Sequence, residues 1–178
     1  MKKTLLAAAA LMLMASFAHA QVGTTTVTNT VSVNVAAEAA LTIGSGATSL
    51  TSIGTNFANY TGSTPFTYFI RTGQSSGTGT INLQVTTDFS PTGGPSVATP
   101  PTSGDALTYT CTVSSPGTAC SGSQTSSTSV TSPVASFGAN AHSTKAGNSA
   151  SVAWTLSNDP LYQTGSYSAV VTFTINAV

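Results

Sequence analysis

The chain has 178 residues, and only 4% of them are charged: four Lys or Arg and four Asp or Glu, which balance at pH 7. Its length is that of one domain. So few cations exclude a groove that follows the phosphates of a nucleic acid, and no basic amphipathic stretch indicates binding to a membrane surface.

The first twenty residues have the pattern of a cleaved bacterial signal peptide. Lys2 and Lys3 precede an apolar run over residues 5–17, and residues 18–20 read Ala-His-Ala, a small-x-small cleavage site. The apolar run is shorter than the about 20 residues of a transmembrane helix, and no second run follows. We therefore predict that residues 21–178 form one exported domain without a membrane span, in the periplasm, at the cell surface or outside the cell.

The stretch 25–43 alternates between apolar and polar side chains. The apolar ones are Val27, Val31, Val33, Val35, Ala37, Ala39, Leu41 and Ile43. This period of two predicts a half-buried strand. One strand of this length would span about 60 Å, and ordinary strands have about 5–6 residues. We therefore expect a bend near 36–40 or a first part that projects from the domain. A short helical turn over the Ala-rich residues 36–40 is the alternative.

Five further strands are predicted in the middle of the chain, at 66–71, 80–88, 106–113, 149–157 and, more weakly, 124–137. The apolar faces of these strands carry Ile81, Leu83, Val85, Leu107, Tyr109, Cys111, Val113, Ala150, Val152, Trp154 and Leu156, and the weakest strand has Val130, Val134 and Phe137 as its apolar residues. Pro133 places the weakest of these strands at an edge or a bulge.

The predicted loops are rich in Gly, Ser, Thr, Asn and Pro. In the loop 44–62, we expect Ile53, Phe57 and Tyr60 to pack against the domain. The loop 90–104 contains four prolines and connects the strands that end at 88 and begin at 106.

The clearest strand is the stretch 165–178. Its apolar face carries Tyr167, Ala169, Val171, Phe173, Ile175 and Ala177, and hydroxyl and amide side chains occupy most of the other face. Such a face must be covered by a second sheet. Seven or eight strands without a helix predict an all-β fold, a single antiparallel sandwich of immunoglobulin-like type, with a barrel or jelly roll as the alternative.

Cys111 and Cys120 are the only cysteines, and in an exported chain we expect them to form a disulfide. They flank a Ser-Pro-Gly turn, so the bond would join the two arms of a hairpin. A metal site would need further ligands, and the spacing is not that of a Cys-x-x-Cys redox motif.

No catalytic, cofactor or metal site is predicted, and we expect a protein that is not an enzyme. His142 is the only histidine after the leader, the four acids stand singly, and no Gly-x-Ser-x-Gly elbow is present. Trp154 occupies an inward strand position and is expected in the core. Tyr60 and Tyr162 are freer to stack on a ligand such as a sugar.

The alternating segment 27–35 and the C-terminal strand resemble secreted bacterial pilin-like sandwich proteins, of the spore-coat-U-like and chaperone–usher types. The resemblance implies that one subunit lends an extended N-terminal strand to an open groove of the next. Residues 21–35, with Val27, Val31, Val33 and Val35 as pocket-filling side chains, would be that donor. The alternative is that they form the first strand of a self-complete monomer. Here both cysteines are central, whereas such subunits often place one in the first strand.

These features predict an exported structural or adhesive surface protein, a component of a fibre, matrix or coat. Its partners would be other copies of itself or other surface proteins, because a surface of low charge favours association. The alternative function is a secreted carbohydrate- or protein-binding module that uses Tyr60 and Tyr162 to hold a glycan or peptide.

Overall fold

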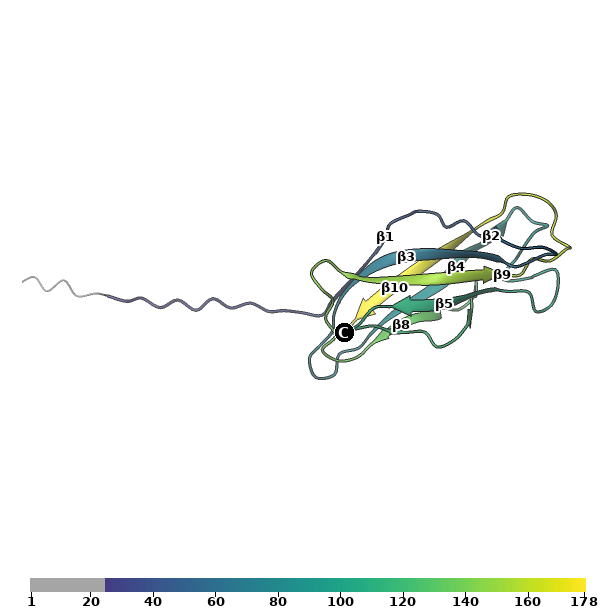
Figure 1. The fold of residues 1–178 in the computed structure, drawn as a ribbon. Coiled ribbons are helices and arrows are strands. Elements are labelled where there is room, and N and C mark those ends of the chain that lie inside the picture. The colour runs from purple at the N-terminus through teal and green to yellow at the C-terminus, as the bar shows by residue number, and fades with distance from the viewer. Residues whose placement is uncertain (1–24) are drawn as a thin grey trace, which may run out of the picture. The chain divides into compact units, whose positions relative to one another are not determined.

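The computed structural model describes residues 25–178, so the predicted signal peptide lies outside the described residues. The chain divides into two units, one that ends at Asn34 and one from Val35 to Val178. Residues 25–37 have no regular secondary structure, and every strand belongs to the second unit (Figure 1).

Ten strands and no helix are found in the described part of the chain. The strands are β1 (Glu38–Ile43), β2 (Thr51–Ser52), β3 (Tyr60–Arg71), β4 (Gly79–Ser90), β5 (Leu107–Val113), β6 (Thr118–Ala119), β7 (Gln124–Thr125), β8 (Ser132–Phe137), β9 (Asn148–Leu156) and β10 (Ser168–Ala177). One sheet has the order β1-β3-β9-β5-β7, with β2 also paired to β3, and the other has the order β10-β4-β8-β6. All pairs are antiparallel, which confirms the predicted all-β sandwich.

The core lies between the two sheets and is built from the alternate positions of the long strands. Ile81 and Leu83 of β4 and Val152 of β9 have no exposed surface, and Trp154 is 5% exposed. Alternation predicted these positions because each strand turns one face to the core and the other to solvent. Strand β3 is longer than expected and begins at Tyr60, because its first half pairs along β9.

The predicted strand 124–137 is two short strands that belong to different sheets. Strand β7 pairs with β5 and β8 pairs with β4. Pro133 lies at a register shift between β4 and β8, which confirms the predicted bulge. Val130, one of the apolar residues of the predicted strand, falls in the connection between β7 and β8 and is exposed.

The segment 25–43 forms a strand only in its last third, β1, which begins at Glu38. Residues 38–40 are extended, so the alternative of a helical turn is wrong. The expectation that Ile53 and Phe57 pack against the domain is also wrong, since they are 86% and 60% exposed. They lie in the hairpin loop between β2 and β3, which runs past the ends of the paired strands.

Cys111 and Cys120 form the predicted disulfide, with a distance of 5.5 Å between their Cα atoms. The bond does not join the arms of a hairpin as predicted. Cys111 lies in β5 of one sheet, whereas Cys120 follows β6 of the other and donates its backbone N–H to the carbonyl of Val134. The disulfide therefore ties the two sheets together at the side of the sandwich where β6 and β7 lie.

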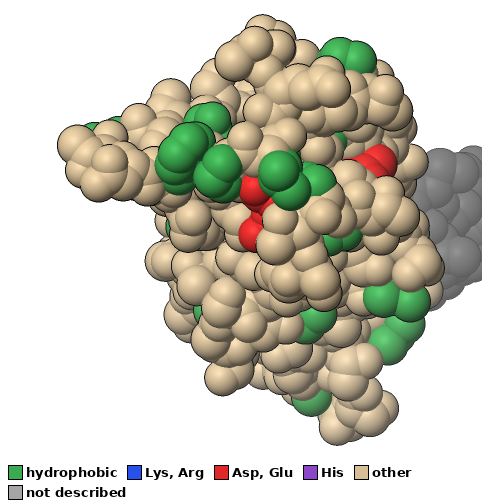
Figure 2. Space-filling model, turned by 90° about the vertical axis from the view of Figure 1, so that its right-hand side faces the viewer, with side chains coloured by type: hydrophobic (Ala, Val, Ile, Leu, Met, Phe, Trp, Pro, Cys, Tyr) green, Lys and Arg blue, Asp and Glu red, His purple; other side chains and the backbone are tan. Residues whose placement is uncertain are grey.

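The surface carries very few charges. Figure 2 shows one face on which uncharged polar groups and backbone predominate, with a few acidic side chains, scattered apolar ones and no visible Lys or Arg. None of the described residues forms a helix long and apolar enough to cross a membrane.

Candidate functional site at the open edge of the sandwich

Strand β10 has one unpaired edge. It pairs with β4 alone among the described strands, over ten residues. Its inward residues are only half-buried, whereas the β4 residues opposite them are fully buried: Phe173 lies across from Leu83 and Val171 from Val85. The sequence predicted that a second sheet would cover this face. The cover is incomplete, because β10 lies at the margin of its sheet.

The neighbouring margin of the other sheet is interrupted. Strand β1 pairs with residues 66–71 of β3, and β2 pairs with Tyr60 and Thr61, so residues 62–65 have no strand partner on that side. Residues 44–50 pass here without joining the sheet. They contact β3 through, among others, a hydrogen bond of 2.6 Å between the hydroxyls of Thr48 and Thr64.

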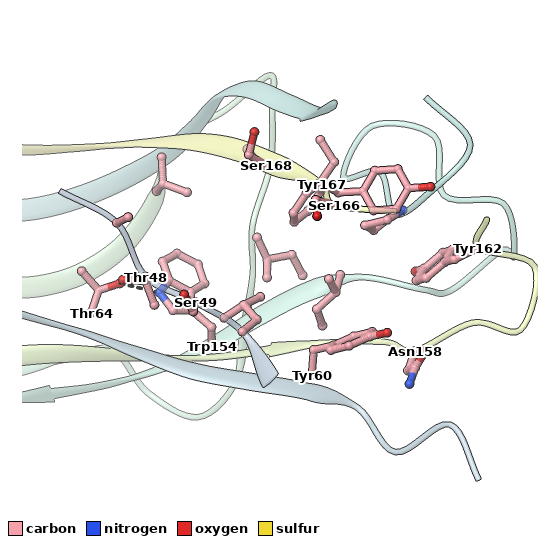
Figure 3. A pocket seen from close by; sticks show the side chains of 18 of the residues that line it. Thr48, Ser49, Tyr60, Thr64, Trp154, Asn158, Tyr162, Ser166, Tyr167 and Ser168 are labelled. Carbon is pink, nitrogen blue, oxygen red and sulfur yellow. Dashed lines mark hydrogen bonds between the residues drawn. The ribbon is translucent and has the colours of Figure 1, made fainter. Parts of the chain in front are cut away.

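A cavity of about 1010 Å³ opens between β10 and the segment 43–50. Figure 3 shows Thr48, Thr64 and Trp154 toward one end and Tyr60, Tyr162 and Tyr167 toward the other. Core residues form its floor, among them Leu107, Trp154, Leu156 and Phe173. The volume is at the upper end of the range for small-molecule sites, about 300–1,000 Å³.

Trp154 is held in the floor by a short polar chain. Its indole N–H donates to the hydroxyl oxygen of Thr64 at 2.8 Å, and Thr64 in turn contacts Thr48. The ring also packs against Tyr109, with centroids 5.4 Å apart. Since only 5% of Trp154 is exposed, it is a core residue as predicted and has no free ring face for a sugar.

Both tyrosines singled out in the sequence line this cavity. Tyr60 lies at the start of β3, and Tyr162 lies in the loop between β9 and β10. Burial raises the pKa of Tyr162 to about 12, and the negative charges of Asp105 and Asp159 act in the same direction. Asn158 lies near the hydroxyl end of Tyr60 in Figure 3 and donates its side-chain N–H to the carbonyl of Ala58.

Tyr167 is a third tyrosine at the mouth of the cavity. It precedes β10, and its hydroxyl donates to the carbonyl of Gln163 at 2.8 Å. Its ring lies against Gly94, where a Cβ atom would come within 2.3 Å of the ring. The sequence placed Tyr167 in the inward row of the last strand and missed this role, although the Gly93-Gly94 pair marks a close approach of backbone to another group.

Asp88 organises the loop that forms one wall of the cavity. Its carboxylate accepts hydrogen bonds from the backbone N–H groups of Phe89, Val97 and Ala98 and from the hydroxyl of Ser96. Desolvation opposes ionisation of this carboxyl, but the four hydrogen bonds outweigh it and hold its pKa below the ordinary value. The loop supplies Pro95 to the cavity lining.

We expect Asp88→Asn to lower the free energy of unfolding by about 1–2 kcal/mol at pH 7, because an amide cannot accept all four bonds. The folded pKa is the lower one, so this contribution is complete above the unfolded pKa of about 3.9 and is lost as the pH falls through the folded pKa. Denaturant unfolding from pH 7 to pH 2 measures it. Ser96→Ala, which removes one of the four hydrogen bonds to Asp88, should keep the pH dependence. An equal deficit of Asp88→Asn at pH 2 and pH 7 would contradict this role.

The alternating valines at the N-terminal end have no cover. Val27, Val31 and Val33 are 92%, 89% and 86% exposed, and Val35 is 60% exposed. No hydrogen bond from the backbone of residues 25–35 appears in the described part of the chain. The described part of the predicted donor segment, residues 25–35, thus has no regular secondary structure and exposes its apolar side chains at alternate positions to solvent.

His142 is an exposed loop residue, as expected, and its Nε2 lies 2.7 Å from the side-chain oxygen of Asn140. Within residues 25–178, no three His, Cys, Asp or Glu side chains lie close enough together to hold a metal ion. A comparison of the chain with protein-family models, with curated proteins and with solved structures finds no match.

Proposed function

We propose that this protein is an exported structural subunit of a fibre, matrix or coat, in which the N-terminal segment of one copy adds as a strand to β10 of another copy. The observation that carries the proposal is the free edge of β10 beside a large cavity that reaches the core. A strand placed there would pair with an open row of backbone groups and cover half-buried apolar side chains.

The N-terminal segment matches this edge in length and pattern. Residues 26–35 are ten residues long, as is β10. Four of their five odd positions are valine, a residue that suits strands, and all four are largely exposed in the single chain. Each valine that becomes fully buried contributes about 1.5–3 kcal/mol, which is offset in part by the cost of ordering the segment.

Export and self-association are supported by the composition and the disulfide. Disulfides persist in oxidising compartments outside the cytosol, and Cys111 and Cys120 form one. A surface with few charges has little repulsion to oppose association, and the described residues carry only Arg71 and Lys145 as cations.

A pair of matched charge variants tests the proposal. Val31→Asp combined with Val33→Asp places two carboxylates among the side chains that would enter the groove. Thr30→Asp combined with Ser32→Asp adds the same charge to the opposite face of the same segment. Light scattering over a range of concentrations should show oligomers for the wild type and the second variant, and a monomer for the first.

Two outcomes would contradict strand donation. If both variants form oligomers as the wild type does, association does not use the valine face of the segment. Deletion of residues 21–35 that leaves the mass distribution and stability unchanged would show that the segment is dispensable, as in a self-complete monomer.

A wild-type protein that is monomeric at every concentration would favour the second candidate function, a secreted carbohydrate- or protein-binding module. The observation behind it is that Tyr60 and Tyr162, far apart in sequence, meet at the mouth of one cavity with Asn158 (Figure 3). Aromatic rings and a few polar groups around a concave site are typical of ligand pockets. Binding of a glycan that Tyr60→Ala and Tyr162→Ala abolish would establish it.

A further inference from the structure

Two carboxylates face each other at one end of the sandwich without a cation. Asp105 precedes β5 and Asp159 follows β9, and these two strand ends are neighbours because Leu107 pairs with Leu156. The cations of the described residues, Arg71 and Lys145, lie together at the opposite end, around a second cavity.

Asp159 carries a buried oxygen atom to which no described residue makes a hydrogen bond of normal geometry. The residue is only 9% exposed. Its Oδ1 accepts the backbone N–H of Leu161 at 2.8 Å, whereas its Oδ2 is buried and has no hydrogen-bond partner. Buried carboxylate oxygens are normally paired or bound to a metal, so this atom indicates a missing partner.

The side chains around Asp159 end in oxygen atoms, and none of them is positively charged. The side chains of Thr102 and Asp105 lie beside its carboxyl, and the hydroxyl of Tyr162 lies 3.5 Å from Oδ2 of Asp105. The nearby Thr102 hydroxyl and the backbone N–H of Leu161 keep the pKa of Asp159 below its ordinary value. Among the described residues, no Lys or Arg forms an ion pair with either of these two acids.

We propose that a calcium ion binds between Asp105 and Asp159. Ca²⁺ prefers six to eight oxygen ligands, from carboxylates, hydroxyl or carbonyl groups and water. Two carboxylates and the Thr102 hydroxyl supply part of this set, and backbone carbonyls and water would supply the rest. Mg²⁺ fits less well because it demands a strict octahedron and dehydrates reluctantly, and Zn²⁺ lacks nitrogen or sulfur ligands here.

The ion would join the two loops at the mouth of the cavity. Thr102 and Asp105 end the loop after β4, and Asp159 begins the loop that carries Tyr162 and Tyr167. With only two carboxylates, we expect a dissociation constant of about 10⁻⁴–10⁻³ M, the range of extracellular calcium modules. This inference is independent of strand donation, because it concerns residues distant from the N-terminal segment in sequence.

Thermal unfolding of the purified, disulfide-bonded protein tests the site. Addition of about 10 mM Ca²⁺ after removal of divalent ions should raise Tm by about 3–10 °C, and isothermal titration should show one ion per chain. Asp105→Asn and Asp159→Asn should each abolish the shift. Glu38→Gln, which removes a carboxylate that is paired with Arg71 elsewhere, should keep it.

The proposal is overturned if Ca²⁺ does not raise Tm, if Mg²⁺ raises it equally, or if both Asp variants respond as the wild type does. Should Asp159→Asn fail to fold, the half-buried Asp105 decides the question through its own variant. The monomeric Val31→Asp/Val33→Asp variant should bind Ca²⁺ normally, so a failure of the calcium site and a failure of self-association give different results.

Discussion

Replacing Trp154 by alanine should lower the free energy of unfolding by about 3–5 kcal/mol, the largest effect of any single substitution that we expect in this chain. The indole is almost fully buried, packs against Tyr109 and forms the floor of the open cavity. Its removal would enlarge that cavity into the core. It would also leave the buried hydroxyl of Thr64 without its donor.

Trp154→Phe is the matched control, because it retains an aromatic ring but lacks the N–H group. It should lose less stability than the alanine variant, and the remaining deficit reports the bond to Thr64 together with the smaller volume of the ring. Urea unfolding at pH 7 measures both free energies. A deficit below about 1 kcal/mol for Trp154→Ala would mean that the ring is not part of the packed core.

Removing the disulfide should cost about 2.5–3 kcal/mol, the second largest effect. In the chain-entropy model, this is the value for a closed loop of about ten residues, and the two cysteines are separated by nine positions. The bond also joins the two sheets at the margin opposite β10, where β6 and β7 have only two residues each. Such short strands contribute little pairing of their own.

The double variant Cys111→Ala/Cys120→Ala, compared with the wild type in urea, measures this contribution. Reduction of the wild type should lower its stability by a similar amount, and reduction of the double variant should change nothing. A double variant as stable as the oxidised wild type would show that the pairing of β8 with β4 is sufficient to hold that margin closed.

The long strands could be predicted because burial imposes a period of two on them. Ile81, Leu83 and Val85 alternate with polar residues, and so do Val152 and Trp154. Strands β2, β6 and β7 are too short to show any period, and only the register with a distant partner creates them. The exposure of Ile53 and Phe57 could not be predicted either, because the sequence of a loop does not show which residues pack against its side chains.

The candidate site was predicted in part. The alternation of apolar and polar residues singled out the N-terminal valines. The expected position in loops singled out Tyr60 and Tyr162. The roles of Asp88 and Asp159 depend on groups brought near by folding: four donors along a loop for the first, and Thr102 and Asp105 from another loop for the second. In the sequence both acids are single charges among Ser, Thr and Pro.

The position of β4 between β8 and β10 has a consequence for how the chain folds. Residues that pair across β4 and β10, such as Ile81 and Ile175, are separated by most of the domain, so the polypeptide has a high contact order and its assembly should be slow. Because synthesis proceeds from the N-terminus, strand β4 would lack its neighbour β10 until residue 177 had been made. During that interval the nascent protein would expose an aggregation-prone edge, so its folding yield should rise in the presence of a holdase chaperone.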